Sequence, residues 1–227
     1  MNFLLVLIII FCAQNLCAQS LMHITFEGVE VGKFPSGWGS RDQKNMTKVY
    51  SVQAEGEKKF LHADAHDLSV PIGYETKLDM KDYPILRWRW RGVIFPTGSN
   101  EQIKSGADSV LGLYVVFSRL PFVKAIKYIW SDTLPIGTAF ASPYSRGTKI
   151  IVVRSGRALV GTWIIEERGM LSDYERFFGK EKKHPVAKGI AILTDSDNTH
   201  SRAVGDYADI SITLSREKAQ IKIKEAE

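Results

Sequence analysis

The sequence predicts an all-β fold, a single two-layer antiparallel β-sandwich of the jelly-roll type with one short helix. About ten short segments alternate apolar and polar residues, as half-buried strands do. Turn residues separate these segments at short, regular intervals, which is typical of a sandwich. Only residues 172–175 have the Ser-x-x-Glu spacing of a capping box, so the helix is expected there, with Ser172 as its N-cap and Gly179 at its end.

The strand at residues 86–91 shows the alternation most clearly. Leu86, Trp88 and Trp90 occupy alternate positions, and successive side chains of a strand point to opposite faces of the sheet. The 3.6-residue period of a helix would mix the two kinds of side chain. We therefore expect the tryptophans in the core and a row of guanidinium groups on the opposite face. This arginine row consists of Arg87, Arg89 and Arg91.

The remaining strands are expected on both sides of this one. Residues 110–117 are apolar on both faces, which is typical of a central, doubly covered strand. Residues 149–154 and 161–168 are expected to form a hairpin around Ser155-Gly156. The further strands are expected at residues 22–27, 47–52, 59–63, 69–78, 110–117, 124–130, 149–154, 161–168, 186–194 and 207–214.

The first residues have the features of a secretory signal peptide. Residues 3–13 are uncharged and apolar, and the small residue Ala18 follows at a suitable cleavage position. The apolar run is shorter than the ~20 residues of a membrane span. We therefore expect an exported protein, periplasmic or secreted, with no transmembrane segment once residues 1–18 are removed. The β-sandwich domain would then occupy residues 19–214, followed by a charged tail at residues 215–227.

Composition narrows the chemistry of the mature chain. Cys12 and Cys17 would leave with the signal peptide, so no disulfide, thiol nucleophile or cysteine metal site would remain. The formal net charge of +5 favours anionic ligands and does not require nucleic acid as a partner. The sequence has no nucleophile elbow, P-loop or HExxH motif.

The arginine row allows two interpretations. Its guanidinium groups could face solvent or pair with carboxylates of neighbouring strands, for which residues 161–168 offer partners. They could instead form the floor of a groove that binds carboxylate or sulfate groups through bidentate hydrogen bonds. The second interpretation predicts an anionic ligand.

An acidic element, Asp195-Ser196-Asp197-Asn198-Thr199, follows an apolar strand. It presents several oxygen ligands within one turn, as calcium loops do at their start. It lacks the Gly and the distant Glu of an EF-hand. Asp and Asn also favour turns by bonding their own backbone, so an ordinary turn is the alternative to a calcium site.

Two histidines and a carboxylate, His62, Asp64 and His66, would share one face of a strand. Their composition matches a transition-metal site, but alternate strand positions lie about 7 Å apart, which is wide for ligands of one ion. We therefore expect them to be exposed polar residues.

A series of motifs runs through the mature chain. They are Trp88-Arg89-Trp90, Tyr114-Val115-Val116-Phe117, Tyr128-Ile129-Trp130, Arg168, Asp173-Tyr174, Phe178-Gly179, Asp195-Ser196-Asp197-Asn198-Thr199 and Tyr207-Ala208-Asp209-Ile210. In this series the chain resembles an uncharacterised exported-protein family, domain of unknown function 3047. The resemblance implies a sandwich similar to carbohydrate-binding modules and no established activity. The chain departs from the family pattern at Gly112, where an Arg is usual, and at Gly169, where an acidic residue is usual.

The similarity to carbohydrate-binding modules also implies a metal. In such sandwiches the first and last strands often lie together and share a structural calcium ion. Glu27, at the end of the first expected strand, and Asp209, on the last, would be the matching carboxylates.

Together these features predict a non-catalytic ligand-binding β-sandwich of the cell envelope, with an anionic glycan as its ligand. A jelly-roll polysaccharide lyase is the enzymatic alternative, in which Arg89 would neutralise a uronate and Tyr114 or a histidine would act as base. A protein-interaction module without a small ligand is the third reading. The expected ligand-binding residues are Arg87, Arg89, Arg91, Tyr114, Trp130, Arg168, Asp195 and Asp197.

Overall fold

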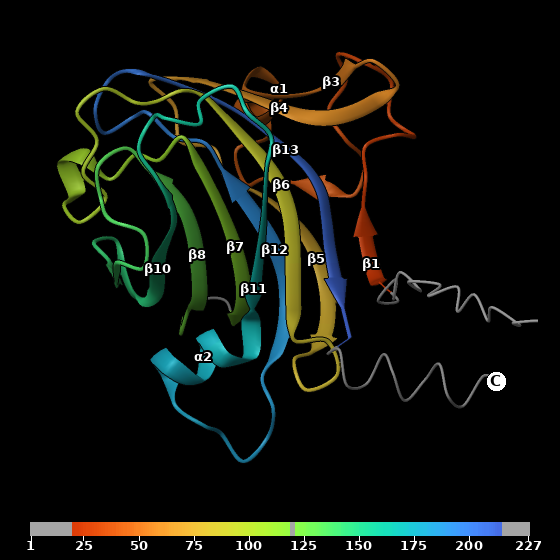
Figure 1. Ribbon diagram of the computed structural model, residues 1–227, viewed down its shortest axis with the longest axis vertical. Coiled ribbons are helices and arrows are strands. Elements are labelled where there is room, and N and C mark those ends of the chain that lie inside the picture. The colour runs from red at the N-terminus through yellow and green to blue at the C-terminus, as the bar shows by residue number, and fades with distance from the viewer. Residues whose placement is uncertain (1–19, 119–120, 215–227) are drawn as a thin grey trace, which may run out of the picture.

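The computed structural model describes residues 20–118 and 121–214, which form two β-sheets packed face to face (Figure 1). The expected two-layer sandwich is confirmed. The expected signal peptide, both cysteines and the charged tail lie outside the described residues. Within the described part, no helix has the length and apolar character needed to cross a membrane.

The first sheet, here called sheet A, has the strand order β11-β6-β13-β4-β3, and β1 also pairs with β13. Its strands are β1 (Ser20–Ile24), β3 (Tyr50–Glu55), β4 (Lys58–His66), β6 (Ile85–Ile94), β11 (Ile164–Gly169) and β13 (Arg202–Thr213). Sheet B has the order β2-β5-β12-β7-β8-β10-β9. Its strands are β2 (Trp38–Gly39), β5 (Ile72–Asp79), β7 (Leu111–Ser118), β8 (Lys124–Ser131), β9 (Ala139–Ser142), β10 (Ser145–Ser155) and β12 (Val186–Leu193).

Aromatic side chains join the two sheets at the centre of the core. Trp88 and Trp90 of β6 are fully buried, as the alternation predicts. Trp88 stacks on Tyr128 of β8, with ring centroids 5.5 Å apart, and meets Trp90 edge to face at 5.2 Å. Trp90 in turn lies 6.4 Å from Trp130 of β8. The inward face of one central strand therefore packs directly on the inward face of a strand in the other sheet.

The sandwich is not wholly antiparallel, because β8 and β10 run parallel. The predicted hairpin of residues 149–154 and 161–168 is wrong for a related reason: β10 belongs to sheet B, whereas β11 pairs with β6 in sheet A. Gly156, at the expected turn, is bonded to β8 instead. Its N–H donates to the Ser131 carbonyl, and its carbonyl accepts from Trp130 Nε1. The chain after β10 then crosses from one sheet to the other.

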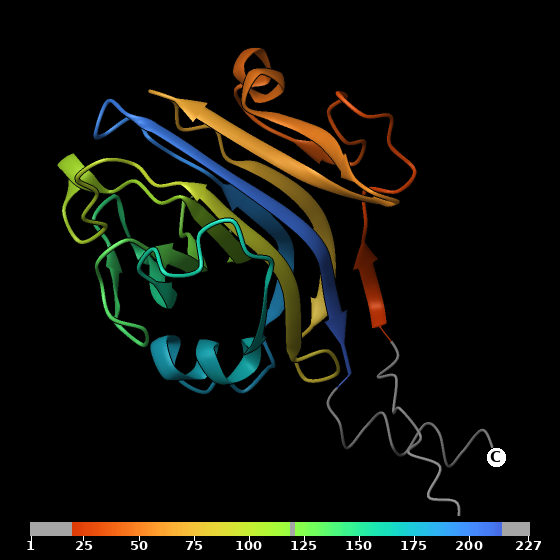
Figure 2. The ribbon, with the colours of Figure 1, turned by 45° about the horizontal axis from the view of Figure 1, so that its top comes forward.

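The structure has two α-helices where one is expected. Residues 47–49, expected as strand, belong to α1 (Gln43–Val49), and β3 begins only at Tyr50. Asp42 caps this helix, because its Oδ1 accepts a hydrogen bond from the Asn45 N–H at 3.1 Å. The sequence analysis overlooked this Asp N-cap. In Figure 2, α1 lies beyond β3 and β4 at the edge of the molecule.

The expected helix is α2 (Met170–Phe178), whose N-cap is Gly169, three residues earlier than the predicted N-cap Ser172. Ser172 is not the cap, because its hydroxyl donates to the Gly169 carbonyl at 2.8 Å. Gly179 ends the helix as predicted, with φ +80°. The ring of Tyr174 in α2 packs against the ring of Phe117 in β7, with centroids 4.7 Å apart. The helix therefore lies across the lower end of the sandwich (Figure 1).

Trp88→Ala should lower the free energy of unfolding by about 3–5 kcal/mol, because it leaves a cavity between the sheets. Val93→Ala, at an exposed position of the same strand, is the matched control and should change it by about 0.5 kcal/mol or less. Chemical denaturation measures both. Equal effects of the two substitutions would contradict the packing of Trp88 described here.

Candidate functional site

The arginine row lies on the outer face of sheet A, and two of its members have carboxylate partners. Arg91 Nε donates to Asp206 Oδ2 at 2.7 Å, and its Nη1 lies 3.2 Å from Glu55. Arg89 Nε forms an ion pair with Asp209 Oδ2 at 2.6 Å. Arg87 is exposed and has no ion pair among the described residues. The interpretation of internal pairing is therefore confirmed for Arg89 and Arg91.

The partners come from β13 and from the end of β3 rather than from residues 161–168. Asp209 reaches the arginine row because β13 is bulged between Ala208 and Ser211. Asp209 has φ +49°, a left-handed conformation that few residues adopt. This bulge turns the carboxylate toward Arg89.

Trp163, which precedes β11, covers the arginines. Its ring centroid lies 4.6 Å from the Arg91 guanidinium carbon and 5.0 Å from that of Arg89. Its indole N–H donates to Glu55 at 3.0 Å. Cations over the face of an indole are attracted by its quadrupole. The guanidinium groups of Arg89 and Arg91 are thus held in two ways, by carboxylates and by the ring of Trp163. The sequence analysis did not identify Trp163 as part of this surface.

The other expected ligand-binding residues lie elsewhere. Trp130 is fully buried in the core. Arg168 pairs with Asp173 of α2 at 2.6 Å. Tyr114 lies on the outward side of β7, where the ammonium group of Lys127 is 5.4 Å from its ring centroid. Arg89 and Tyr114 therefore lie on outer faces of different sheets, so the lyase pairing of these two residues is not assembled, and a histidine base beside Arg89 stays a prediction.

The two remaining residues belong to an acidic cluster. Asp195 and Asp197 are joined by Asp108, which precedes β7, and each of the three has an oxygen within 4.8 Å of the others. Asp195 Oδ1 accepts from the Ser109 N–H at 2.7 Å, and Lys127 Nζ is 4.0 Å from its Oδ2. Burial raises the pKa of Asp195 to about 6.

Asp108 also shapes the turn that follows Asp197. It accepts hydrogen bonds from the backbone N–H groups of Asn198 and Thr199. The turn is thus held by a carboxylate from another loop, in addition to the local chemistry of Asp and Asn. Lys127 lies near Asp195 alone, so the three clustered carboxylates keep an excess of negative charge, and this cluster could hold a metal ion.

Glu27 and Asp209, expected as calcium ligands, each have a protein partner. The Glu27 carboxylate accepts from the Lys59 N–H at 3.1 Å, and Asp209 pairs with Arg89. A calcium ion shared by Glu27 and Asp209 stays a prediction.

A groove crosses the outer face of sheet B. One hollow of about 850 Å³ lies over β2, β5, β12 and β7, with the small residues Gly73, Gly189 and Ala191 among its lining. A second hollow of about 950 Å³ continues it toward the lower end, and both hollows are lined by Glu75. The two hollows together are called the sheet B groove below.

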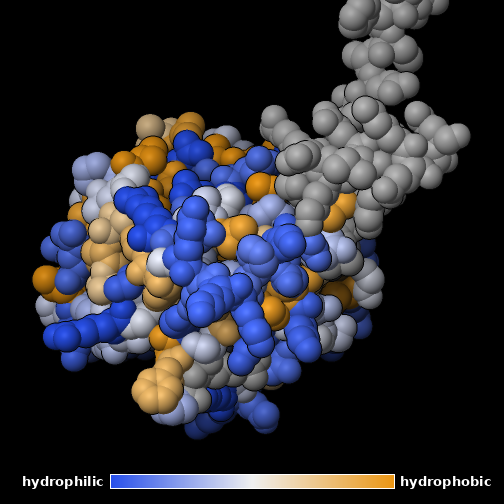
Figure 3. Space-filling view, turned by 90° about the horizontal axis from the view of Figure 1, so that it is seen from below, coloured by the Kyte–Doolittle hydropathy of each residue, from blue (hydrophilic) through white to orange (hydrophobic). Residues whose placement is uncertain are grey.

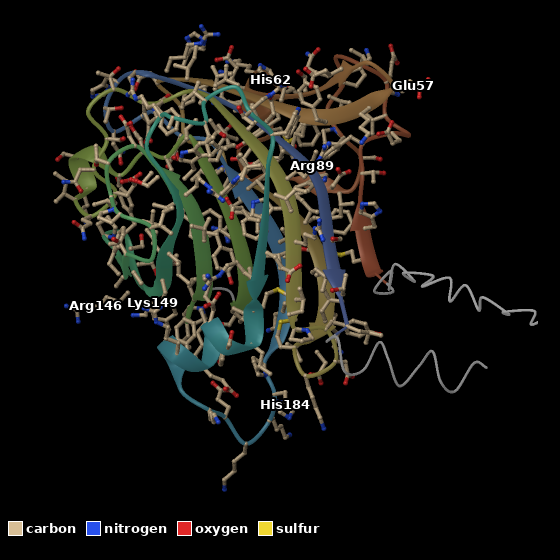
Figure 4. The ribbon with its side chains drawn as sticks, viewed as in Figure 1. Glu57, His62, Arg89, Arg146, Lys149 and His184 are labelled. Atoms are coloured by element: carbon tan, nitrogen blue, oxygen red, sulfur yellow. The ribbon has the colours of Figure 1, made fainter. Side chains whose placement is uncertain are left out.

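The lower part of the sheet B groove is basic. Lys77, Lys183, His184 and Lys188 line it, and none of these has an ion pair among the described residues. Lys124 also lines it but pairs with Glu181 at 2.7 Å. Figure 4 places His184 on the loop below α2, and Figure 3 shows hydrophilic side chains spread across this end. Among the described residues, more cations without an ion pair therefore lie here than on the arginine row.

Calcium at millimolar concentration should raise the melting temperature by about 3 °C or more, since a ligand of the folded state stabilises it. Asp197→Asn should abolish the rise, because it removes a carboxylate of the acidic cluster. Glu57→Gln, which alters an exposed carboxylate at the far end of the β3–β4 turn, should retain it. Differential scanning calorimetry with and without chelator measures the shift, and a rise unaffected by Asp197→Asn would place calcium elsewhere.

Several solved structures have a similar fold. The K1 adhesin domain of Lys-gingipain from Porphyromonas gingivalis W83 is 12% identical, with a TM-score of 0.38 and coverage of 86% of this chain and 98% of that one. The CBM22-1 xylan-binding domain of Xyn10C from Paenibacillus barcinonensis is 12% identical, with a TM-score of 0.39 and coverage of 87% and 95%. The carbohydrate recognition domain of Emp47p is 10% identical, with a TM-score of 0.41 and coverage of 84% and 93%.

No curated protein matches the chain. A family model described as "Protein of unknown function (DUF3047)" matches residues 36–211, from the loop before β2 to β13. This match confirms the resemblance found in the motifs, and the chain belongs to that family.

Proposed function

We propose that this chain is a non-catalytic carbohydrate-binding β-sandwich that binds an anionic glycan in the sheet B groove. The observation that carries the proposal is the combination of a floor of small residues with unpaired lysines at one end. The expected anionic ligand is retained, but its place moves from the arginine row to the other sheet.

The floor of the groove suits an extended polymer. Gly73 pairs with Ala191 across β5 and β12, and Gly189 pairs with Val116 across β12 and β7. Gly73 and Ala191 are half-buried and carry little or no side chain, so a ligand can approach the sheet closely at this pair. Gly189 is buried, and a side chain there would begin 3.0 Å from the Tyr74 carbonyl oxygen, so its small size serves the close packing of β12 on β5.

The charges of the groove favour an anion. Lys77, Lys183 and Lys188 are exposed and lie along the lower hollow. A lysine ammonium acts as a flexible point charge, which suits carboxylate or sulfate groups spaced along a chain. Arg89 and Arg91 are already neutralised by Asp209, Asp206 and Glu55, so they offer an anion much less.

The two alternatives fit these observations less well. A lyase needs a base beside the cation that neutralises a uronate, and Arg89 and Tyr114 do not meet. A protein-interaction module would bind mainly through an apolar patch. The groove has apolar lining residues, among them the exposed Phe122, but the unpaired lysines at its lower end favour an anion over an apolar partner. We also propose that the protein works outside the cytoplasm, in the cell envelope, in keeping with the expected signal peptide.

The combined substitution of Lys77, Lys183 and Lys188 by Gln should weaken binding to polygalacturonate by about tenfold or more at low salt, if each exposed charge contributes about 0.5–1 kcal/mol. Binding by the unmodified protein should also weaken as salt rises, because exposed charges are screened. Isothermal titration calorimetry measures both effects.

The matched control is the combined substitution of Lys33, Lys44 and Lys58 by Gln, which removes the same charge from exposed positions outside the groove. Its binding should stay within a factor of about two of the unmodified protein. Equal losses in the two variants would show that net charge alone attracts the polymer. Release of unsaturated products during the titration would contradict the non-catalytic part of the proposal.

A further inference from the structure

A separate hollow of about 480 Å³ lies on the outer face of sheet A, on the other sheet from the sheet B groove. Its lining includes Gln53, Phe60, His62, Arg91 and Asp206, from β3, β4, β6 and β13. Small-molecule sites in proteins fall in the range of about 300–1,000 Å³. Figure 4 shows His62 at the upper part of the sandwich, far from His184 at the lower end.

Asp206 fixes the orientation of His62. Its carboxylate is 2% exposed and lies 2.7 Å from His62 Nδ1 and 2.7 Å from Arg91 Nε. A carboxylate can only accept hydrogen bonds, so Nδ1 is the nitrogen that carries the proton. In the neutral ring, Nε2 is then an acceptor, and it has no hydrogen-bond partner among the described residues.

Arg91 presents a donor to the same hollow. Its Nε donates to Asp206 and its Nη1 to Glu55, which leaves Nη2 without a partner in the described part of the chain. Trp163 covers the guanidinium plane at 4.6 Å and holds it in place. The hollow therefore has one hydrogen-bond donor, Arg91 Nη2, and one acceptor, His62 Nε2, on side chains that are held in place by their other contacts.

One aromatic ring, Phe60, lines the same hollow, and a second, Trp163, lies next to Phe60. Phe60 is 7% exposed and lines it, and the Trp163 ring meets Phe60 edge to face at 5.4 Å. Trp163 itself is half-buried and anchored through Glu55. A pyranose ring has an apolar C–H face that packs on such surfaces and a rim of hydroxyl groups. Each hydroxyl can both donate and accept hydrogen bonds. Such groups can therefore bond to the acceptor of His62 and to the donor of Arg91.

We infer that this hollow is a second glycan-binding site, which takes a neutral sugar unit with adjacent hydroxyl groups. One hydroxyl donates to His62 Nε2, its neighbour accepts from Arg91 Nη2, and the C–H face packs beside Phe60 and Trp163. The site favours a neutral sugar because the charge of Arg91 is already balanced by Asp206 and Glu55. It is independent of the sheet B groove and of its lysines.

Tryptophan fluorescence can test the site directly. Of the five tryptophans, Trp38 is 7% exposed and Trp88, Trp90 and Trp130 are fully buried, so quenching by acrylamide reports mainly on Trp163. The probes are neutral xylan, cellulose, mannan and β-1,3-glucan oligosaccharides at high salt, which suppresses binding to the lysines. At least one should protect the fluorescence from quenching, and Trp163→Phe should remove the protected signal.

His62→Asn is the most specific variant, because its amide can still donate to Asp206 in place of Nδ1 but lacks Nε2. It should raise the Kd for the protecting sugar by about tenfold, as expected for one lost hydrogen bond. His66→Asn, on the same strand but paired with Asp64, is the matched control and should leave the Kd unchanged. Ala54→Tyr fills the hollow from an exposed position, so it tests the site without disturbing Asp206.

The outcomes separate this inference from the proposed function. Protection that survives the Lys77, Lys183 and Lys188 substitutions but is lost in His62→Asn and Ala54→Tyr supports the second site. No protection by any of the neutral sugars, or equal protection in both hollow variants and the unmodified protein, overturns it. Loss of polygalacturonate binding in the lysine variant alone would bear only on the sheet B groove.

Discussion

The aromatic contact between β6 and β8 is the interaction on which the rest of the structure depends. Trp88 stacks on Tyr128 at 5.5 Å, and Trp90 approaches Trp130, so two strands from different sheets share one buried layer. Once the tryptophans are buried, strand geometry directs the alternate residues of β6 to the opposite face. In β6 the alternate residues are Arg87, Arg89 and Arg91, so burying the tryptophans places these three arginines on the outer surface of sheet A.

Charge is distributed unequally over the two outer faces. On sheet A, two arginines are balanced by Asp206, Asp209 and Glu55. On sheet B, the Lys127 side chain occupies the space next to Gly112. A side chain at Gly112 would begin 2.6 Å from Lys127 Cε. Three lysines at the lower end of sheet B, Lys77, Lys183 and Lys188, have no such carboxylate partner among the described residues.

The alternation of apolar and polar residues along the chain predicted most of the fold. They identified β6 and β7 and their buried faces, and therefore the two-layer sandwich. Period alone cannot say which strands pair, so the parallel β8–β10 pair and the crossing from β10 to β11 were missed. The site was harder to predict because its partners are distant in sequence. Asp108 is 87 residues from Asp195, and Asp209 faces Arg89 only because of a bulge that leaves no clear pattern.

The crossing from β10 to β11 also has a mechanical consequence. After Ser155 the chain leaves sheet B, and by Ile164 it has become the edge strand of sheet A. The two sheets are thus tied by continuous backbone as well as by packed rings. The Arg154–Glu166 ion pair at 2.8 Å joins the same two strands across the gap. The continuous backbone and this ion pair together restrain the two sheets from sliding past each other at this edge.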